Sequence, residues 1–190
     1  MEVFRLSNNT STEHGWLTPT SGDPDYDEAL DRLLSRWMRN VSGLPPAMVR
    51  PRWQKEQPSL PSVETNWCAI GVIGCTTDNN PAFTHQTEEN VQLWRHETFE
   101  CMASFYGPDG MSFASRFRDG IAVPQNNSEL NLFGLTLGDY TGLTPFPELI
   151  NQQWVRRYDM TVRLRRKVIR EYNIKAIVDV ENTVTISTGD

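Results

Sequence analysis

Residues 151–169 read NQQWVRRYDMTVRLRRKVI, and from position 158 to position 164 apolar and polar side chains alternate strictly. One side carries Tyr158, Met160, Val162 and Leu164, and the other side carries Asp159, Thr161, Arg163 and Arg165. A period of two residues is typical of a β-strand with one face on the core and one face in solvent. The stretch therefore predicts a long, half-buried strand.

The solvent side of this predicted strand is basic. Seven of the 18 Lys and Arg residues lie in or beside it: Arg156, Arg157, Arg163, Arg165, Arg166, Lys167 and Arg170. Acidic residues gather early in the chain instead: Asp23, Asp25, Asp27, Glu28 and Asp31. Opposite charges on separate surfaces suit head-to-tail contacts between copies of one chain. We therefore predict that Asp25, Asp27 and Glu28 form a subunit or partner interface together with the seven basic residues. The alternative is that both groups are ordinary solvated faces.

A helix is predicted early in the chain, over residues 25–41. Apolar residues recur there at three- and four-residue spacing, which gives the single apolar stripe of a helix packed on a core. Asp23 is a favourable N-cap, Pro24 suits the first helical turn, and Gly43 suits the end of the helix. We expect the stripe to lie in the core and not at a cofactor.

The rest of the chain predicts strands and one more helix. The second helix is predicted over 111–122, with Asp109 as its cap and Met111 on its buried side. Apolar runs predict strands over 66–77, 91–106, 130–137 and 174–180, with a turn near 171–173. Together these elements predict an α+β fold, in which a mixed, mainly antiparallel sheet carries two helices on one face.

The chain of 190 residues is long enough to bury a core. Its first 22 residues are polar and without periodicity, so we expect an extended arm over 1–22, flexible or ordered by a partner, followed by one domain over 23–190. Trp53 lies in a proline-rich connection over 44–62, where it would either pack down or meet a partner.

The three cysteines lack the number and spacing of a disulfide framework, so we expect free thiols and a reducing compartment. The N-terminal sequence has no basic stretch followed by an apolar run, and no secretory signal is predicted. No apolar stretch reaches the length that spans a bilayer, so no membrane partner is expected.

No catalytic or metal-binding constellation stands out in the sequence. The three histidines lack metal-ligand spacing to one another or to a cysteine, and there is no phosphate loop or nucleophile elbow. Asp23, Asp25 and Asp27 alternate like metal ligands, but the start of a helix explains them better. We therefore expect no catalytic residue, no metal and no cofactor.

The basic strand has two possible uses. Clustered arginines can neutralise nucleic-acid phosphates, but the net charge of −6 and the lack of interleaved aromatic residues beyond Trp154 argue against a nucleic-acid-binding face. The same arginines can pair with the acidic helix start across a subunit boundary. We prefer the second use.

The chain also resembles a known family. The pattern LIN…QQW…RRYDMTVRLRR, preceded by SFYGPDG and a short helix ending in FRDGIAV (residues 104–123), resembles the neck and tail terminator proteins of tailed bacteriophages. The resemblance extends over residues 25–170.

This resemblance implies a structural virion protein that forms a homo-oligomeric ring, with six-fold symmetry, at the head–tail junction. The ring would close the tail tube, so its partners would be other copies of the chain, the tail tube protein and a head connector or portal-side neck protein. DNA would pass through the lumen without specific binding, and assembly would take place in the cytoplasm of the bacterial host. The alternatives are a head-completion or stopper protein of the neck, and a protein-binding module unrelated to phages.

Overall fold

The computed structural model describes residues 16–56, 58–150 and 152–174. The predicted arm over 1–22 and the predicted last strand over 174–180 therefore lie mostly outside the described residues.

The chain divides into two compact units. The larger unit consists of Asp23–Pro81 and Arg95–Val168. The smaller unit contains the described residues of the segments Met1–Gly22, Ala82–Trp94 and Ile169–Asp190. Two long strands, β4 (Asn90–Tyr106) and β9 (Arg157–Asn173), contribute residues to both units. Apart from Arg170, which belongs to the smaller unit, the residues discussed below as candidate contacts belong to the larger unit.

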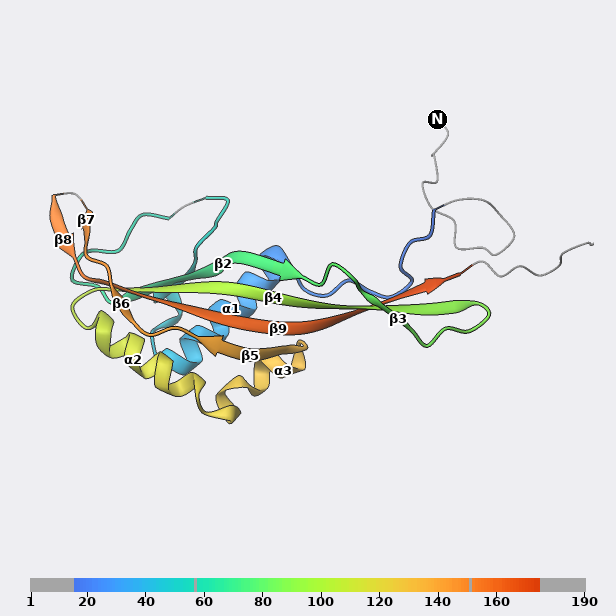
Figure 1. Cartoon of the computed structure of the whole chain (residues 1–190). Helices are drawn as coiled ribbons and strands as arrows, with labels where there is room; N and C mark the ends of the chain where they lie inside the picture. Colours follow the sequence, from blue (N-terminus) through green and yellow to red (C-terminus); the bar gives the residue numbers. More distant parts are fainter. Residues whose placement is uncertain (1–15, 57, 151, 175–190) are drawn as a thin grey trace, which may run out of the picture. The chain divides into compact units, whose positions relative to one another are not determined.

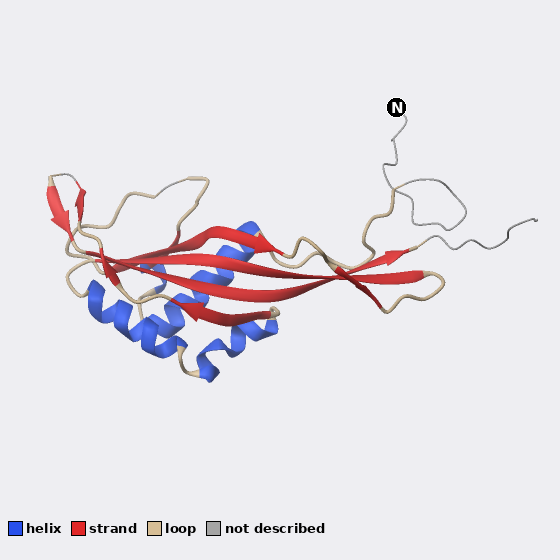
Figure 2. Ribbon diagram, in the orientation of Figure 1, coloured by secondary structure: helices blue, strands red, loops and turns tan. Residues whose placement is uncertain are grey.

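Helices cover one face of the sheet in the larger unit. The described residues contain three α-helices: α1 (Asp27–Ser42), α2 (Gly110–Ile121) and α3 (Ser128–Leu132). In Figure 1 and Figure 2, α2 and α3 lie along one side of the strands and α1 runs behind them. Buried residues of all three helices pack in one core with alternate residues of β4 and β9. The expectation of two helices is therefore corrected to three, and the expected arrangement of the helices on one face matches the structure only roughly.

The sheet is mixed and mainly antiparallel, as predicted. Its central order is β1-β2-β4-β9-β5, in which β1 is parallel to β2, while β2 with β4 and β5 with β9 are antiparallel. Two short strands join it at the sides, since β3 pairs with β4 and β6 pairs with β9, and β7 and β8 form a separate hairpin. The bounds of the strands not yet given are β1 Val49–Pro51, β2 Trp67–Thr77, β3 Ala82–Thr84, β5 Leu135–Tyr140, β6 Thr144–Pro145, β7 Glu148–Ile150 and β8 Gln153–Val155.

The long basic strand with the period-two pattern is β9, which lies in the middle of this sheet. On β9, Met160, Val162 and Leu164 are buried against the helices, as the alternation predicted. The matching residues of β4 are Phe99, Cys101, Ala103 and Phe105, all buried in the same core. Two adjacent strands with this pattern form a continuous apolar surface, which the helices cover.

The apolar stripe of α1 packs on that surface. Leu33, Leu34, Trp37 and Met38 are all buried, and Gly43 ends the helix with a φ of 77° and an N–H that donates to the Arg39 carbonyl oxygen. Both features follow the sequence prediction.

The start of α1 does not follow that prediction. The residue at the N-cap is Tyr26, not Asp23, and it makes no side-chain cap hydrogen bond. The phenol Oη of Tyr26 donates to Glu97 Oε1 on β4 over 2.7 Å, which holds the preceding chain extended up to the first helical residue.

Two other elements depart from the sequence pattern. The predicted strand over 130–137 is the short helix α3 followed by β5. On α2, Met111 is exposed, whereas Ala114, Phe117 and Ile121 are buried. In the first turn of α2 the buried position is Gly110, which is in line with Ala114, Phe117 and Ile121, so Met111 falls at the edge of the buried stripe.

The predicted turn near 171–173 is wrong, because β9 continues to Asn173. Within the smaller unit, Thr20 N–H donates to the Glu171 carbonyl oxygen over 2.7 Å, and Glu171 N–H donates to Ser21 Oγ over 3.1 Å. Ile174 N–H donates to the Glu89 carbonyl oxygen over 2.8 Å. These partners keep the backbone extended where the sequence alone suggested a turn.

Candidate interaction surfaces

The sheet of the larger unit has an outer face, which we define as the face that the helices do not cover. Arg163 of β9 lies on this face and makes two ion pairs of 2.8 Å, from Nε to Glu100 Oε1 and from Nη1 to Asp139 Oδ1. The hydrogen bonds, first that with Glu100, raise the pKa of Arg163. Because all three side chains remain partly exposed, we regard this network as a way to position Arg163 and not as a large source of stability.

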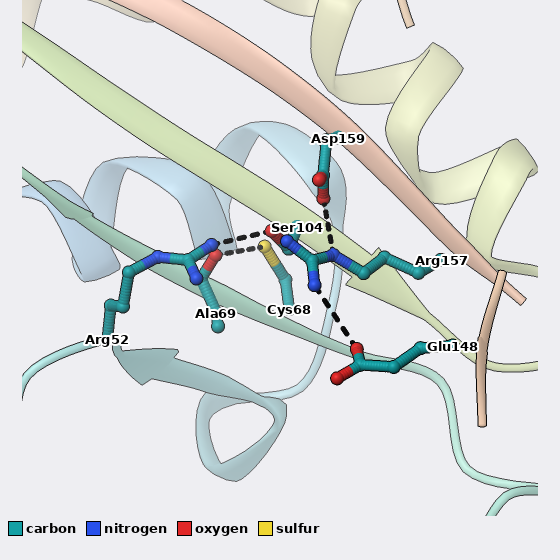
Figure 3. Close-up of polar contacts among 7 residues, drawn as sticks. All are labelled: Arg52, Cys68, Ala69, Ser104, Glu148, Arg157 and Asp159. Atoms are coloured by element: carbon teal, nitrogen blue, oxygen red, sulfur yellow. Dashed lines mark hydrogen bonds and ion pairs between the residues drawn. The ribbon is translucent and has the colours of Figure 1, made fainter. Parts of the chain in front are cut away.

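Arg157 lies at the start of β9 and is more strongly enclosed. Its Nε donates to Asp159 Oδ1 over 2.8 Å, and its Nη1 donates to Glu148 Oε2 over 3.2 Å (Figure 3). The guanidinium also lies over the rings of Tyr106 and Phe146, at 5.8 and 5.1 Å from the centroids. Burial alone would lower the pKa of Arg157, but the hydrogen bonds with Asp159 and Glu148 outweigh it and the pKa is raised.

Another arginine approaches the same face from the chain that follows β1. Arg52 Nη2 donates to Ser104 Oγ of β4 over 2.5 Å, as Figure 3 shows. A Cβ added at Gly71 would lie 2.8 Å from the Arg52 Cβ, so only glycine allows the chain to pass this close to β2. The outer face is thus an organised layer of charged side chains.

Arg166 does not lie on the outer face, which corrects the sequence prediction. It follows Leu164 by two residues, so the alternation places it on the buried side of β9, where its Nε pairs with Glu97 Oε2 over 2.8 Å. Its Nη1 donates to the Asp25 carbonyl oxygen over 2.7 Å, and its guanidinium lies over the Tyr26 ring. Arg166 therefore holds the start of α1 to the sheet within one copy of the chain.

The other predicted interface residues are distributed as follows. Asp25, Asp27 and Glu28 are exposed at the start of α1, Arg156 and Arg165 are exposed without an ion pair to any described residue, and Lys167 is exposed. Arg170 is half-buried in the smaller unit. The structure thus brings the three acidic residues together at the start of α1. Arg157, Arg163 and Arg166 form ion pairs within the chain, whereas Arg156 and Arg165 could pair with carboxylates of another molecule. Their role at an interface stays a prediction.

A groove lies beside the acidic residues. It has a volume of about 870 Å³ and separates the first turns of α1 from the chain after β1. Leu30, Val72 and Phe99 supply an apolar lining, together with Cys75. Trp53 lines the opposite side, where its indole Nε1 donates to the Val72 carbonyl oxygen over 3.1 Å. Trp53 thus packs down on its own chain and still remains largely exposed.

The rim of the groove is acidic. Its charged lining residues are Asp27, Glu28, Asp31, Glu56, Arg32 and Lys55, four carboxylates against two cations. One of the cations, Arg32, already pairs with Glu28 over 3.3 Å. Burial, and to a lesser extent the neighbouring Asp27, raises the pKa of Asp31, so an added positive charge would be favoured there.

The hairpin of β7 and β8 presents an exposed apolar pair. Leu149 and Trp154 are register partners and are 57% and 72% exposed. The hairpin itself is held firmly, because Val155 is buried and Ile150 packs against the outer-face cluster of Trp67, Ala69 and Tyr106. Sequence reasoning singled out Trp154 only as an aromatic residue; the signal that it missed was the pairing of Leu149 with Trp154 across the intervening turn.

The cysteines give a direct test of these surfaces. Cys68 and Cys101 are fully buried and Cys75 is exposed. Burial raises the pKa of Cys68 and raises that of Cys101 to about 12. In the isolated chain we therefore expect one thiol per chain to react with a maleimide at pH 8, and three thiols in denaturant. Cys75→Ser should abolish the native reaction, and labelling of two or three thiols in the folded chain would contradict the described burial.

Within the described residues no cluster of three or more His, Cys, Asp or Glu side chains has the arrangement of a metal site. No helix in the described ranges has both the length and the apolar character needed to cross a membrane. What this part of the chain offers is a set of surfaces: a charged sheet face, an acidic groove and an exposed apolar hairpin.

Residues 28–190 match the family described as phage neck terminator protein. Curated proteins yield no match. The family match covers most of the chain, from the second residue of α1 through every described strand of the sheet, and it confirms the resemblance seen in the sequence. The chain therefore belongs to the phage neck terminator protein family and is a structural component of the bacteriophage neck.

Proposed function

We propose that the chain forms a homo-oligomeric ring that closes the head-proximal end of the tail tube and joins it to the head connector. The observation that carries this proposal is the family match over residues 28–190. A ring of identical copies needs two different, complementary surfaces on each copy. The acidic start of α1 and the exposed Arg156 and Arg165 supply opposite charges for such surfaces.

The internal ion pairs support passage of DNA without tight binding. Three arginines of the predicted basic face, Arg157, Arg163 and Arg166, are neutralised by carboxylates of the same chain. Strong phosphate binding requires several cations that exchange small counterions for phosphate. We therefore expect weak binding of the purified protein to double-stranded DNA, in line with a channel that DNA must traverse.

The mass of the protein in solution tests the ring directly. We expect light scattering over a series of concentrations to find a species of about six times the 21.8 kDa chain mass, and negative-stain images to show rings. Where the protein alone is monomeric, we expect it to bind purified tail tubes at one end, since the tube would then template the ring.

Co-sedimentation distinguishes a tail terminator from a stopper or head-completion protein of the neck. A terminator should pellet with tail tubes, whereas a stopper or head-completion protein should pellet with DNA-filled heads and leave tubes in solution. A chain that stays monomeric at every concentration and binds neither tubes nor heads would overturn the proposed function.

A further inference from the structure

We propose that the β7–β8 hairpin of one copy docks into the acidic groove of the next copy, with Trp154 and Leu149 entering the groove and Arg156 facing its carboxylates. The proposal rests on the proposed ring and names the contact between its subunits. It commits to a second copy of this chain as the occupant of the groove.

The hairpin has the character of an anchor at an interface. Large aromatic side chains that fill a partner's pocket dominate the binding energy of many interfaces. Trp154 and Leu149 are both more than half exposed, while Val155 on the opposite side of the hairpin is buried. Arg157 also ties the hairpin to β9 through Glu148. A fixed hairpin with an exposed apolar pair loses little freedom on docking.

The groove matches the hairpin in size and polarity. Its volume of about 870 Å³ lies within the range of ~300–1,000 Å³ typical of sites that enclose drug-sized ligands, which gives room for an indole and a leucine side chain. Leu30, Val72 and Phe99 provide apolar contacts for these side chains.

The charges on the two surfaces are complementary. Arg156 is exposed and follows Trp154 by two residues, with the buried Val155 between them, so the cation lies next to the exposed apolar pair of the hairpin. Docking would bring this cation to a rim whose carboxylates outnumber its cations, and Asp31 there has a raised pKa. Complementary charge around an apolar anchor fixes orientation and speeds association.

One copy cannot satisfy this contact alone. The hairpin packs beside Trp67 at the first residue of β2, whereas the groove is lined by Val72 and Cys75, five and eight positions further along that strand. At ~3.3 Å per residue, the groove therefore begins roughly 16 Å from Trp67 and extends to roughly 26 Å from it. Both surfaces are fixed to the same sheet, so the hairpin must meet a groove on another copy. A contact between two different surfaces is heterologous and, when the rotation closes, generates a ring.

Cysteine cross-linking tests the contact, because Cys75 already lies in the groove. Leu149→Cys should form covalent dimers and longer ladders with a short bis-maleimide, and adding Cys75→Ser should abolish them. Leu132→Cys is the matched control: Leu132 lies on α3 and is 85% exposed, yet it should form no ladder. Apart from these substitutions the variants keep the wild-type sequence. The cross-linker is added after the variants have assembled, in solution or on tail tubes.

A second variant measures the anchor itself. Trp154→Ala should weaken assembly at least about 30-fold, while the thermal unfolding of the dilute chain stays that of the wild type. Assembly should also protect Cys75 from maleimide, and Trp154→Ala should restore its reactivity.

The outcomes separate the contact from the ring. If the wild type assembles but Leu149→Cys gives no ladder through Cys75 and Trp154→Ala assembles normally, the contact is wrong and the ring stands. If the wild type assembles neither alone nor on tail tubes, the proposed function is overturned and the contact with it.

Discussion

Replacing Arg166 with alanine is expected to lower the free energy of unfolding by about 3–5 kcal/mol, because it leaves Glu97 as a buried charge without its partner. The side chains of Arg166 and Glu97 are 3% and 7% exposed, and their charged atoms lie 2.8 Å apart. The same substitution removes a hydrogen bond to the Asp25 carbonyl oxygen and the contact of the guanidinium with the Tyr26 and Phe99 rings. Urea denaturation followed by tryptophan fluorescence measures the loss.

Two comparisons make this result specific. Arg163→Ala removes an arginine from partly exposed ion pairs on the opposite face of the same strand, and it should lower the urea midpoint far less than Arg166→Ala does. The pair of substitutions Glu97→Gln and Arg166→Met should recover most of the loss, since no unpaired charge then remains. Equal losses for Arg166→Ala and Arg163→Ala would show that the buried pair does not hold the start of α1.

Phe117→Ala is expected to lower the free energy of unfolding by about 3–5 kcal/mol through the cavity that it leaves. Phe117 of α2 is fully buried, where its ring meets Trp37 edge to face at a centroid distance of 5.1 Å and Phe105 at 5.9 Å. The substitution therefore removes the contact that joins both long helices to β4.

Met111→Ala serves as the control on the same helix. Because Met111 is exposed, we expect a change within about 0.5 kcal/mol. Thermal and chemical denaturation of both variants should give the same ranking. A large loss for Met111→Ala with a small loss for Phe117→Ala would contradict the burial of Phe117 and the exposure of Met111.

The elements that the sequence predicted well carry long, regular patterns. The alternation of residues 158–164 and the stripe of α1 each repeat often enough to define one face, and the structure buries those faces. The short elements were harder to predict. Residues 128–132 form a helix whose position depends on distant partners, since Glu129 pairs with Arg36 and Asn126 accepts a hydrogen bond from Trp37 Nε1.

The candidate surfaces depended even more on the tertiary structure. The acidic cluster at the start of α1 and the basic strand were visible as charge patterns, but the sequence could not show that Arg157, Arg163 and Arg166 find carboxylates within the chain. The groove joins α1 to residues of β2 and β4, so no local pattern could reveal it.

The place of β9 in the sheet determines when the chain can fold during its synthesis. β9 is the last described strand, yet it lies between β4 and β5, and Arg166 reaches the Asp25 carbonyl oxygen across 141 residues of sequence. A ribosome-bound chain that ends before β9 has an unpaired edge on β4 and no partner for β5, and such edges favour aggregation. Folding of the sheet must therefore wait until β9 has been translated, because a chain that ends before β9 cannot complete the larger unit.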